Sequence, residues 1–183
     1  MRRRRLAVAG ALVCVLSAGT ATAALHIYSY EPSDAQTREA SGPLTFEVRR
    51  SLIGAITILN LRSTVADASA ELRRSDPKTL GPGGLKAVSG ADPGERDLYE
   101  IEPADQGGAL IAALCPGATR AWMAFSRIRF DQDLSIEIMG AKSGAPARIC
   151  HRLAYDFHGE WKAPPSGVVL RERDILHGRY PGT

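Results

Sequence analysis

Two cysteines in this sequence could do thiol chemistry: Cys115, in the segment CPG, and Cys150, which directly precedes His151. A reactive cysteine needs a thiolate with a neighbouring base or positive charge. On an extended strand, however, adjacent side chains point to opposite faces, so His151 is expected to point away from Cys150. The pattern therefore predicts a structural disulfide between Cys115 and Cys150 and no reactive thiol.

A second group with possible chemistry is Asp156, His158 and Glu160, which alternate along one predicted strand and so share a face. Such a face suggests a metal site or an acid–base pair. Same-face neighbours lie roughly 6.6 Å apart, so Asp156 and Glu160 are about 13 Å apart and cannot share one ion without residues from another strand. We interpret the three residues as a solvated polar face and predict no catalytic residue, metal ligand or cofactor site.

The chain begins with a pattern typical of export. Four arginines follow Met1, an apolar run leads to Leu16, and Ala21-Thr22-Ala23 supplies a small-x-small cleavage signal. Residues 1–23 are therefore predicted to be a signal peptide cleaved after Ala23, by the general or the twin-arginine route. The competing interpretation is a retained anchor, since the uncharged stretch has about the length that spans a bilayer. In the cleaved form, Cys115 and Cys150 are the remaining cysteine pair, in an oxidising compartment.

Charge and motifs exclude several function classes. The whole chain has a formal charge of +3, but residues 1–23 hold four arginines and no acid, so the remainder is nearly neutral. Such a domain has no field that gathers phosphates, and we expect no nucleic-acid partner. The sequence contains no G-x-S-x-G elbow, no H-E-x-x-H zinc motif, no P-loop and no Rossmann glycine pattern.

The elements that would position these residues are mostly strands. In residues 44–50, LTFEVRR alternates apolar and polar side chains, and residues 134–138 do the same. Within residues 147–161, one face is predicted to hold Ile149, Leu153, Tyr155, Phe157 and Trp161. Short connections make residues 122–161 a predicted three-stranded antiparallel meander. The fold class is therefore mainly β, sandwich-like and antiparallel, with one or two short helices.

The best helix candidate is the segment DQGGALIAAL at residues 105–114, which ends before Cys115-Pro116-Gly117. Residues 65–73 fit either a helix or a strand, and their alternation favours a strand. The apolar run at residues 52–61 is too short to span a membrane and is interpreted as a buried strand.

Breaks in composition divide the chain. Residues 24–43 are polar and turn-rich and are predicted to be an extended lead-in, residues 44–165 the β-rich globular domain, and residues 166–183 a C-terminal tail. Tyr28 and Tyr30 in the lead-in are expected either to pack onto the sheet or to mark a segment that adds a strand to a partner.

Taken together, these patterns predict a secreted or periplasmic, non-enzymatic domain that binds an envelope or extracellular partner or has a structural role there. We expect no transmembrane segment in the chain after cleavage of the leader. The alternative is a hydrolase or metal-dependent enzyme that uses His158 with Asp156 or Glu160.

Overall fold

The structure is a computed structural model that describes residues 24–51, 54–92, 94–126 and 132–162. The predicted signal peptide (1–23) and C-terminal tail (166–183) lie outside the described residues. The question of a cleaved leader or a retained anchor therefore stays a prediction.

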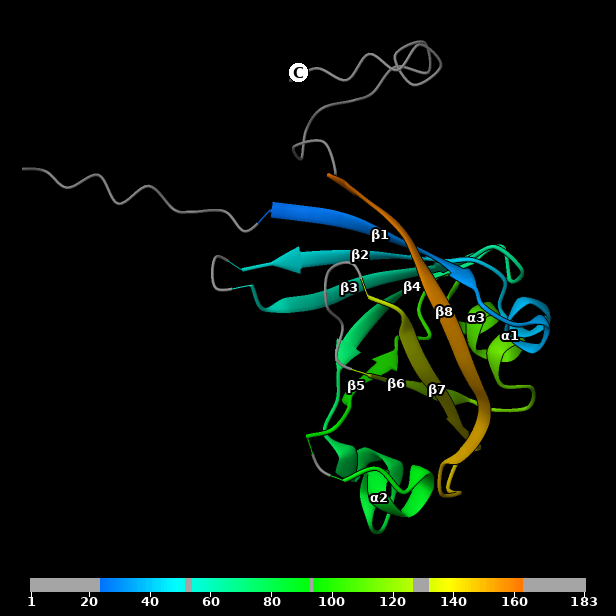
Figure 1. The fold of residues 1–183 in the computed structure, drawn as a ribbon. Coiled ribbons are helices and arrows are strands. Elements are labelled where there is room, and N and C mark those ends of the chain that lie inside the picture. The colour runs from blue at the N-terminus through cyan, green and yellow to red at the C-terminus, as the bar shows by residue number, and fades with distance from the viewer. Residues whose placement is uncertain (1–23, 52–53, 93, 127–131, 163–183) are drawn as a thin grey trace, which may run out of the picture.

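Eight antiparallel strands form a closed barrel in which each strand pairs with the next along the chain and the last pairs with the first (Figure 1). In chain order the strands are β1 (Ala24–Pro32), β2 (Leu44–Arg50), β3 (Ile56–Ser63), β4 (Ala68–Arg74), β5 (Asp97–Ile101), β6 (Arg120–Phe125), β7 (Leu134–Ala141) and β8 (Arg148–Lys162). The helical elements are α1 (Ala35–Ala40), the 3₁₀ helix η1 (Pro77–Leu80), α2 (Gly84–Ser89) and α3 (Gly107–Leu114).

The antiparallel, mainly β class with short helices is confirmed, but the sheet is a closed barrel and not a sandwich. The sheet is closed because of β1, which lies within the segment predicted to be an extended lead-in. Its buried residues His26, Tyr28 and Tyr30 alternate with the less buried Ile27 and Ser29. β1 pairs with β2 on one side and with β8 on the other, which closes the sheet and removes its edges.

Several elements agree with the sequence patterns. The predicted helix before Cys115 is α3, and the ambiguous segment at residues 65–73 contains the strand β4. The predicted meander is present as β6, β7 and β8, each paired with the next. The alternation in β2 appears as Leu44, Phe46 and Val48, all 0% exposed.

Aromatic side chains fill the barrel interior. Phe46 packs edge-to-face against Tyr30, with ring centroids 5.8 Å apart, and against Phe125 at 5.6 Å. Tyr99 packs against Phe125 in the same way at 5.6 Å. Each of these burials stabilises the fold by about 1.5–3 kcal/mol. Tyr28 and Tyr30 therefore belong to the core, which decides between the two roles that the sequence left open.

Helices α1 and α3 lie together at one end of the barrel (Figure 1). The N-cap of α1 is Asp34, whose carboxylate accepts a hydrogen bond from the backbone N–H of Thr37 at 2.7 Å. The Thr37 hydroxyl accepts from the backbone N–H of Ala154 in β8 at 3.1 Å, and Ser41 shares a hydrogen bond with the buried hydroxyl of Tyr155. Burial raises the pKa of Tyr155, which stays a neutral member of this network.

A second, smaller apolar cluster lies outside the barrel. Leu80 at the end of η1 and Leu85 in α2 belong to one cluster with Leu98, Trp122 and Met139 of strands β5, β6 and β7. β6 is consequently buried on both faces, unlike a strand with one solvent-exposed face.

Candidate functional site

Cys115 and Cys150 are joined in a disulfide, with their Cα atoms 5.4 Å apart. Cys115 is fully buried where α3 ends, and Cys150 lies near the start of β8, so the bond joins the helix to the barrel wall. A Cβ at Gly140 of β7 would collide with the Cys115 sulfur, so this position admits only glycine beside the bond.

The expected geometry around His151 is wrong because β8 contains a bulge. Ile138 of β7 lies opposite His151, but the next residue, Met139, lies opposite Ile149, so Cys150 is the inserted residue. Ile138 belongs to the interior, and residues opposite each other in a strand pair share a face, so His151 lies on the inner side. Cys150 also packs against the interior cluster, so the two residues share a side after all.

A second bulge in β8 separates the side chains that were predicted to share one polar face. Tyr30 of β1 lies opposite Phe157, whereas Ser29 lies opposite Gly159, so His158 is inserted between them. Beyond this point the alternation is reversed, and Glu160 lies opposite the buried Tyr28 on the inner face. Asp156 and His158 are exposed, so the prediction that the three residues share a face is wrong.

The same bulge moves Trp161 out of the core. Its side chain is 49% exposed, and it lies opposite Ile27 with its ring 6.3 Å from that of His158.

The Glu160 carboxylate contacts Nδ1 of His26, a contact that sequence reasoning missed, and the two form an ion pair when the imidazole is protonated. His26 is 7% exposed and lies on β1, so the pair crosses the β1–β8 seam that closes the barrel. Burial raises the pKa of the neighbouring Tyr28 phenol and the Glu160 carboxylate raises it further, whereas Arg50 acts in the opposite direction. The contact thus links the two strands that close the barrel.

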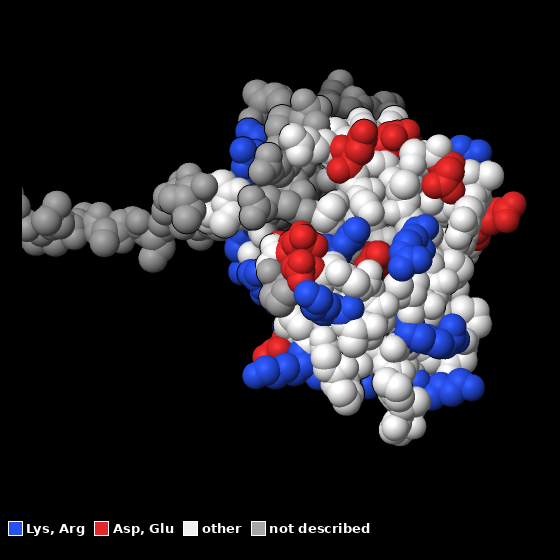
Figure 2. Space-filling view, turned by 60° about the horizontal axis from the view of Figure 1, so that its bottom comes forward, with Lys and Arg blue, Asp and Glu red and all other residues white. Residues whose placement is uncertain are grey.

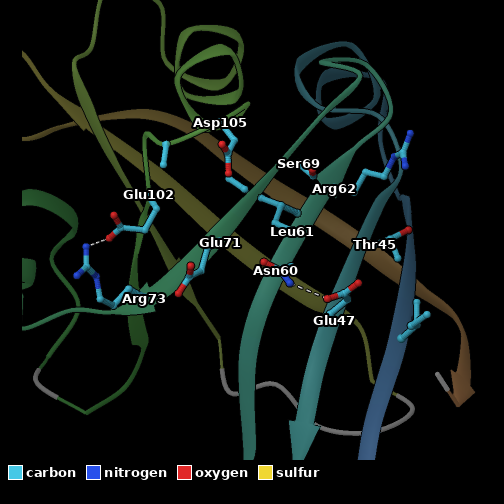
Figure 3. A pocket seen from close by; sticks show the side chains of 13 residues that line it. Thr45, Glu47, Asn60, Leu61, Arg62, Ser69, Glu71, Arg73, Glu102 and Asp105 are labelled. Atoms are coloured by element: carbon cyan, nitrogen blue, oxygen red, sulfur yellow. Dashed lines mark hydrogen bonds and ion pairs between the residues drawn. The ribbon is translucent and has the colours of Figure 1, made fainter. Parts of the chain in front are cut away.

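A groove of about 550 Å³ lies on the outer face of β2, β3 and β4 (Figure 3). We call it the acidic groove. Its lining consists of Ile27, Thr45, Glu47, Asn60, Leu61, Arg62, Ser69, Ala70, Glu71, Arg73, Glu102, Ala104 and Asp105.

The register of three strands places the polar residues of the acidic groove in two rows. Asn60 of β3 lies directly opposite Glu47 of β2 and Glu71 of β4. Its amide donates a hydrogen bond of 2.6 Å to Glu47 (Figure 3). In the next row, Arg62 lies opposite Thr45 and Ser69. Neighbouring strands are about 4.8 Å apart, so each row is a continuous line of polar side chains.

The far wall of the groove is the connection from β5 to α3. Glu102 forms an ion pair with Arg73 of β4 (Figure 3). The backbone N–H of Ser69 donates to Oε1 of Gln106 at 3.1 Å, which ties the connection to the barrel wall. Asp105 adopts the left-handed backbone region with φ 52°, and a Cβ at Gly107 would collide with the carbonyl oxygen of Glu102. The backbone conformation of this connection therefore fixes the position of the wall.

Negative charge predominates in the lining. Two of the carboxylates are engaged, Glu47 by Asn60 and Glu102 by Arg73. No side-chain hydrogen bond or ion pair within the described residues engages Glu71 or Asp105, and both are exposed. The groove therefore offers free carboxylates beside hydroxyl and amide groups, an arrangement suited to a cationic, hydrogen-bonding ligand.

Sequence reasoning did not find the acidic groove. The alternation in β2 shows that Thr45 and Glu47 face outward, and the same holds for Ser69 and Glu71 in β4. Which residues of three strands stand side by side depends on the register, which a bulge between β2 and β3 also shifts.

The fold and site define a closed, eight-stranded antiparallel barrel with an acidic groove on its outer wall. Comparison of the chain with protein-family models, with curated proteins and with solved structures finds no match.

Proposed function

We propose that the chain is an exported, non-enzymatic binding protein whose acidic groove takes a positively charged segment of a partner in the cell envelope or outside the cell. The observation that carries the proposal is a hollow of about 550 Å³ in which Glu71 and Asp105 present unengaged carboxylates. Both stand on fixed backbone, one in the barrel wall and one on the wall formed by the β5–α3 connection. Preformed sites of this kind bind with little loss of conformational entropy.

Export is supported by the leader pattern and by the disulfide, since such bonds persist mainly in oxidising compartments. In the described ranges, no helix combines the length and the apolar character needed to cross a bilayer. N-terminal sequencing of the natively exported protein should begin at Ala24 or within a residue or two of it. An intact Met1 in the membrane fraction would support the retained anchor instead.

The alternative function, a hydrolase or metal-dependent enzyme built on His158, has weaker support. The bulge in β8 leaves Asp156 and His158 exposed on one side and Glu160 beside His26 on the other. Among the residues that the structure describes, no group of three His, Cys, Asp or Glu side chains could hold a metal ion.

The binding proposal is tested with a labelled pentalysine peptide and the exported chain beginning at Ala24, followed by fluorescence anisotropy at low salt. The double variant Glu71→Gln/Asp105→Asn should weaken binding by about three- to tenfold, because exposed charge pairs contribute modestly and are screened by salt. The matched control is Glu31→Gln/Glu39→Gln, which removes two exposed carboxylates elsewhere. Equal weakening by both pairs, or no binding of pentalysine, would contradict the proposal.

A further inference from the structure

A second hollow, of about 570 Å³, has no lining residue in common with the acidic groove, and we call it the basic hollow. Three segments surround it: the end of η1 and the start of its link to α2 at residues 79–82, residues 119–122 around the start of β6, and the β7–β8 hairpin at residues 141–146. Backbone hydrogen bonds hold these segments together, from Ala147 N–H to the Leu80 carbonyl at 3.2 Å and from Thr119 N–H to the Ala141 carbonyl at 2.9 Å.

The charge of this hollow is opposite to that of the acidic groove. Arg120 and Lys142 are its charged lining residues, and no Asp or Glu is part of the lining. Arg120 forms an ion pair with Glu100 at 2.7 Å, whereas no ion pair or hydrogen bond within the described residues engages the Lys142 ammonium group. Figure 2, which brings forward the α2 side of the molecule, shows Lys and Arg along the lower part of that face, where Asp and Glu are few.

Trp122 supplies an independent indication of a ligand. Its side chain lines the hollow and is 1% exposed, and its indole Nε1–H has no hydrogen-bond acceptor among the described residues. A buried donor without an acceptor is rare in folded proteins, because it has lost its hydrogen bond to water and no protein acceptor replaces it. The guanidinium carbon of Arg120 lies over the indole, 4.7 Å from the ring centroid.

The rest of the lining is mainly apolar or small. Leu80, Pro82 and Pro146 contribute the larger apolar surfaces, together with Ala141 and Ala145. A pocket with an apolar wall and a few polar groups at one place is the usual form of a small-molecule site, and its volume falls within the usual range of about 300–1,000 Å³.

We propose that the basic hollow binds a small organic anion with an apolar body and an oxyanion head. One oxygen of the head accepts a hydrogen bond from Trp122 Nε1, and the ammonium group of Lys142 balances its charge beside the guanidinium of Arg120, which is also paired with Glu100. The Arg120 side chain is 50% exposed and lies over the ring, so it shifts to admit the head. Charge-assisted hydrogen bonds of this type are stronger than neutral ones. The apolar body lies against Leu80, Pro82 and Pro146.

The test uses hexanoate and hexyl phosphate as probes and hexanol as the neutral isostere. The exported chain carries Trp161→Phe, so that the remaining indole is Trp122, and its N–H resonance is followed by NMR. Saturable shifts of this resonance with either anion, and binding of hexanol weaker by about tenfold or more, are expected because only the anions supply a charged acceptor. Comparison of the two anions distinguishes a carboxylate from a phosphate ligand. Equal binding of hexanol, or no shift with either anion, would overturn the proposal.

Variants check the roles of the named residues. Lys142→Gln should weaken hexanoate binding by about three- to tenfold, as the loss of one exposed charge does. Lys78→Gln, an exposed lysine on η1 outside the lining, is the matched control and should change nothing. Trp122→Phe removes the donor and keeps an aromatic ring, and hexanoate binding to it is measured by isothermal titration calorimetry. Unchanged affinity in both Lys142→Gln and Trp122→Phe would refute the site.

Discussion

The acidic groove and the basic hollow have similar volumes and opposite charge, and they are built in different ways. Three neighbouring strands carry most of the groove, so the register of β2, β3 and β4 decides which side chains meet. The basic hollow is enclosed by connections, namely the η1–α2 link and the β7–β8 hairpin, packed around the first residues of β6. A strand surface presents its polar groups on a rigid frame, whereas a hollow between connections can adapt to its ligand.

Helix α3 is connected to both regions. Its N-terminal side adjoins the acidic groove through Asp105 and Gln106, and its last residue precedes Cys115, which is bonded to β8 close to the hairpin. The helix and its disulfide therefore hold both regions to one barrel. Changes at either end of α3 can show how far the two regions depend on each other.

The largest effect is expected from Cys150→Ser. The bond closes a loop with a sequence separation of 35, and its loss should lower the free energy of unfolding by about 4 kcal/mol on the chain-entropy model. Thermal unfolding measures the loss, and alkylation should then detect a free Cys115. Hydrogen exchange should increase more at the β7–β8 hairpin than in β2 and β3. An equal increase in both would show that the two regions open as one unit.

Gly107→Ala should destabilise the β5–α3 connection that forms one wall of the acidic groove. The new Cβ would collide with the carbonyl oxygen of Glu102, a backbone atom that cannot move aside, so a loss of about 1–3 kcal/mol is expected. Gly108→Ala is the matched control, because its Cβ would make only an ordinary contact of 3.5 Å with the Pro103 carbonyl oxygen. Chemical denaturation of both variants should show that Gly108→Ala is neutral or stabilising. A neutral Gly107→Ala would mean that the β5–α3 connection is not fixed as described.

Glu160→Gln and His158→Ala test the bulge in β8. Glu160 pairs with the buried His26, so its substitution should cost about 1–2 kcal/mol. His158 is exposed, and its substitution should cost less than about 0.5 kcal/mol. Urea titration at neutral pH measures both values. A large loss for His158→Ala with none for Glu160→Gln would contradict the reversed alternation and restore the polar face expected from the sequence.

The smallest effects on stability are expected for the unengaged charges of the two regions. Glu71→Gln and Lys142→Gln should each change the free energy of unfolding by less than about 0.5 kcal/mol, since exposed charges without partners contribute little. Both are measured by thermal unfolding. Instead, Glu71→Gln should weaken the binding of pentalysine, and Lys142→Gln should weaken the binding of hexanoate. A loss of stability above this range in either variant would indicate a structural role for that charge.

The sequence by itself determined the local elements of this protein. Period-two alternation in residues 44–50 predicted β2, and the apolar spacing before Cys115-Pro116-Gly117 predicted α3. The pairing of Cys115 with Cys150 also followed from the sequence, because the predicted cleavage of residues 1–23 leaves two cysteines. These features depend on side-chain periodicity and on residue counting, which are properties of the chain.

The tertiary structure alone decided closure, faces and register. The sandwich-like expectation failed because closure depends on β1 pairing with β8, a contact between opposite ends of the domain that no local pattern records. Strict alternation placed Glu160 beside His158 and His151 away from Cys150, and one inserted residue in each part of β8 reversed both assignments. The row of Glu47, Asn60 and Glu71 exists only because three strands pair in one register. A bulge shifts the chain by one residue, which scarcely alters the hydrophobic pattern but moves every later side chain to the other face.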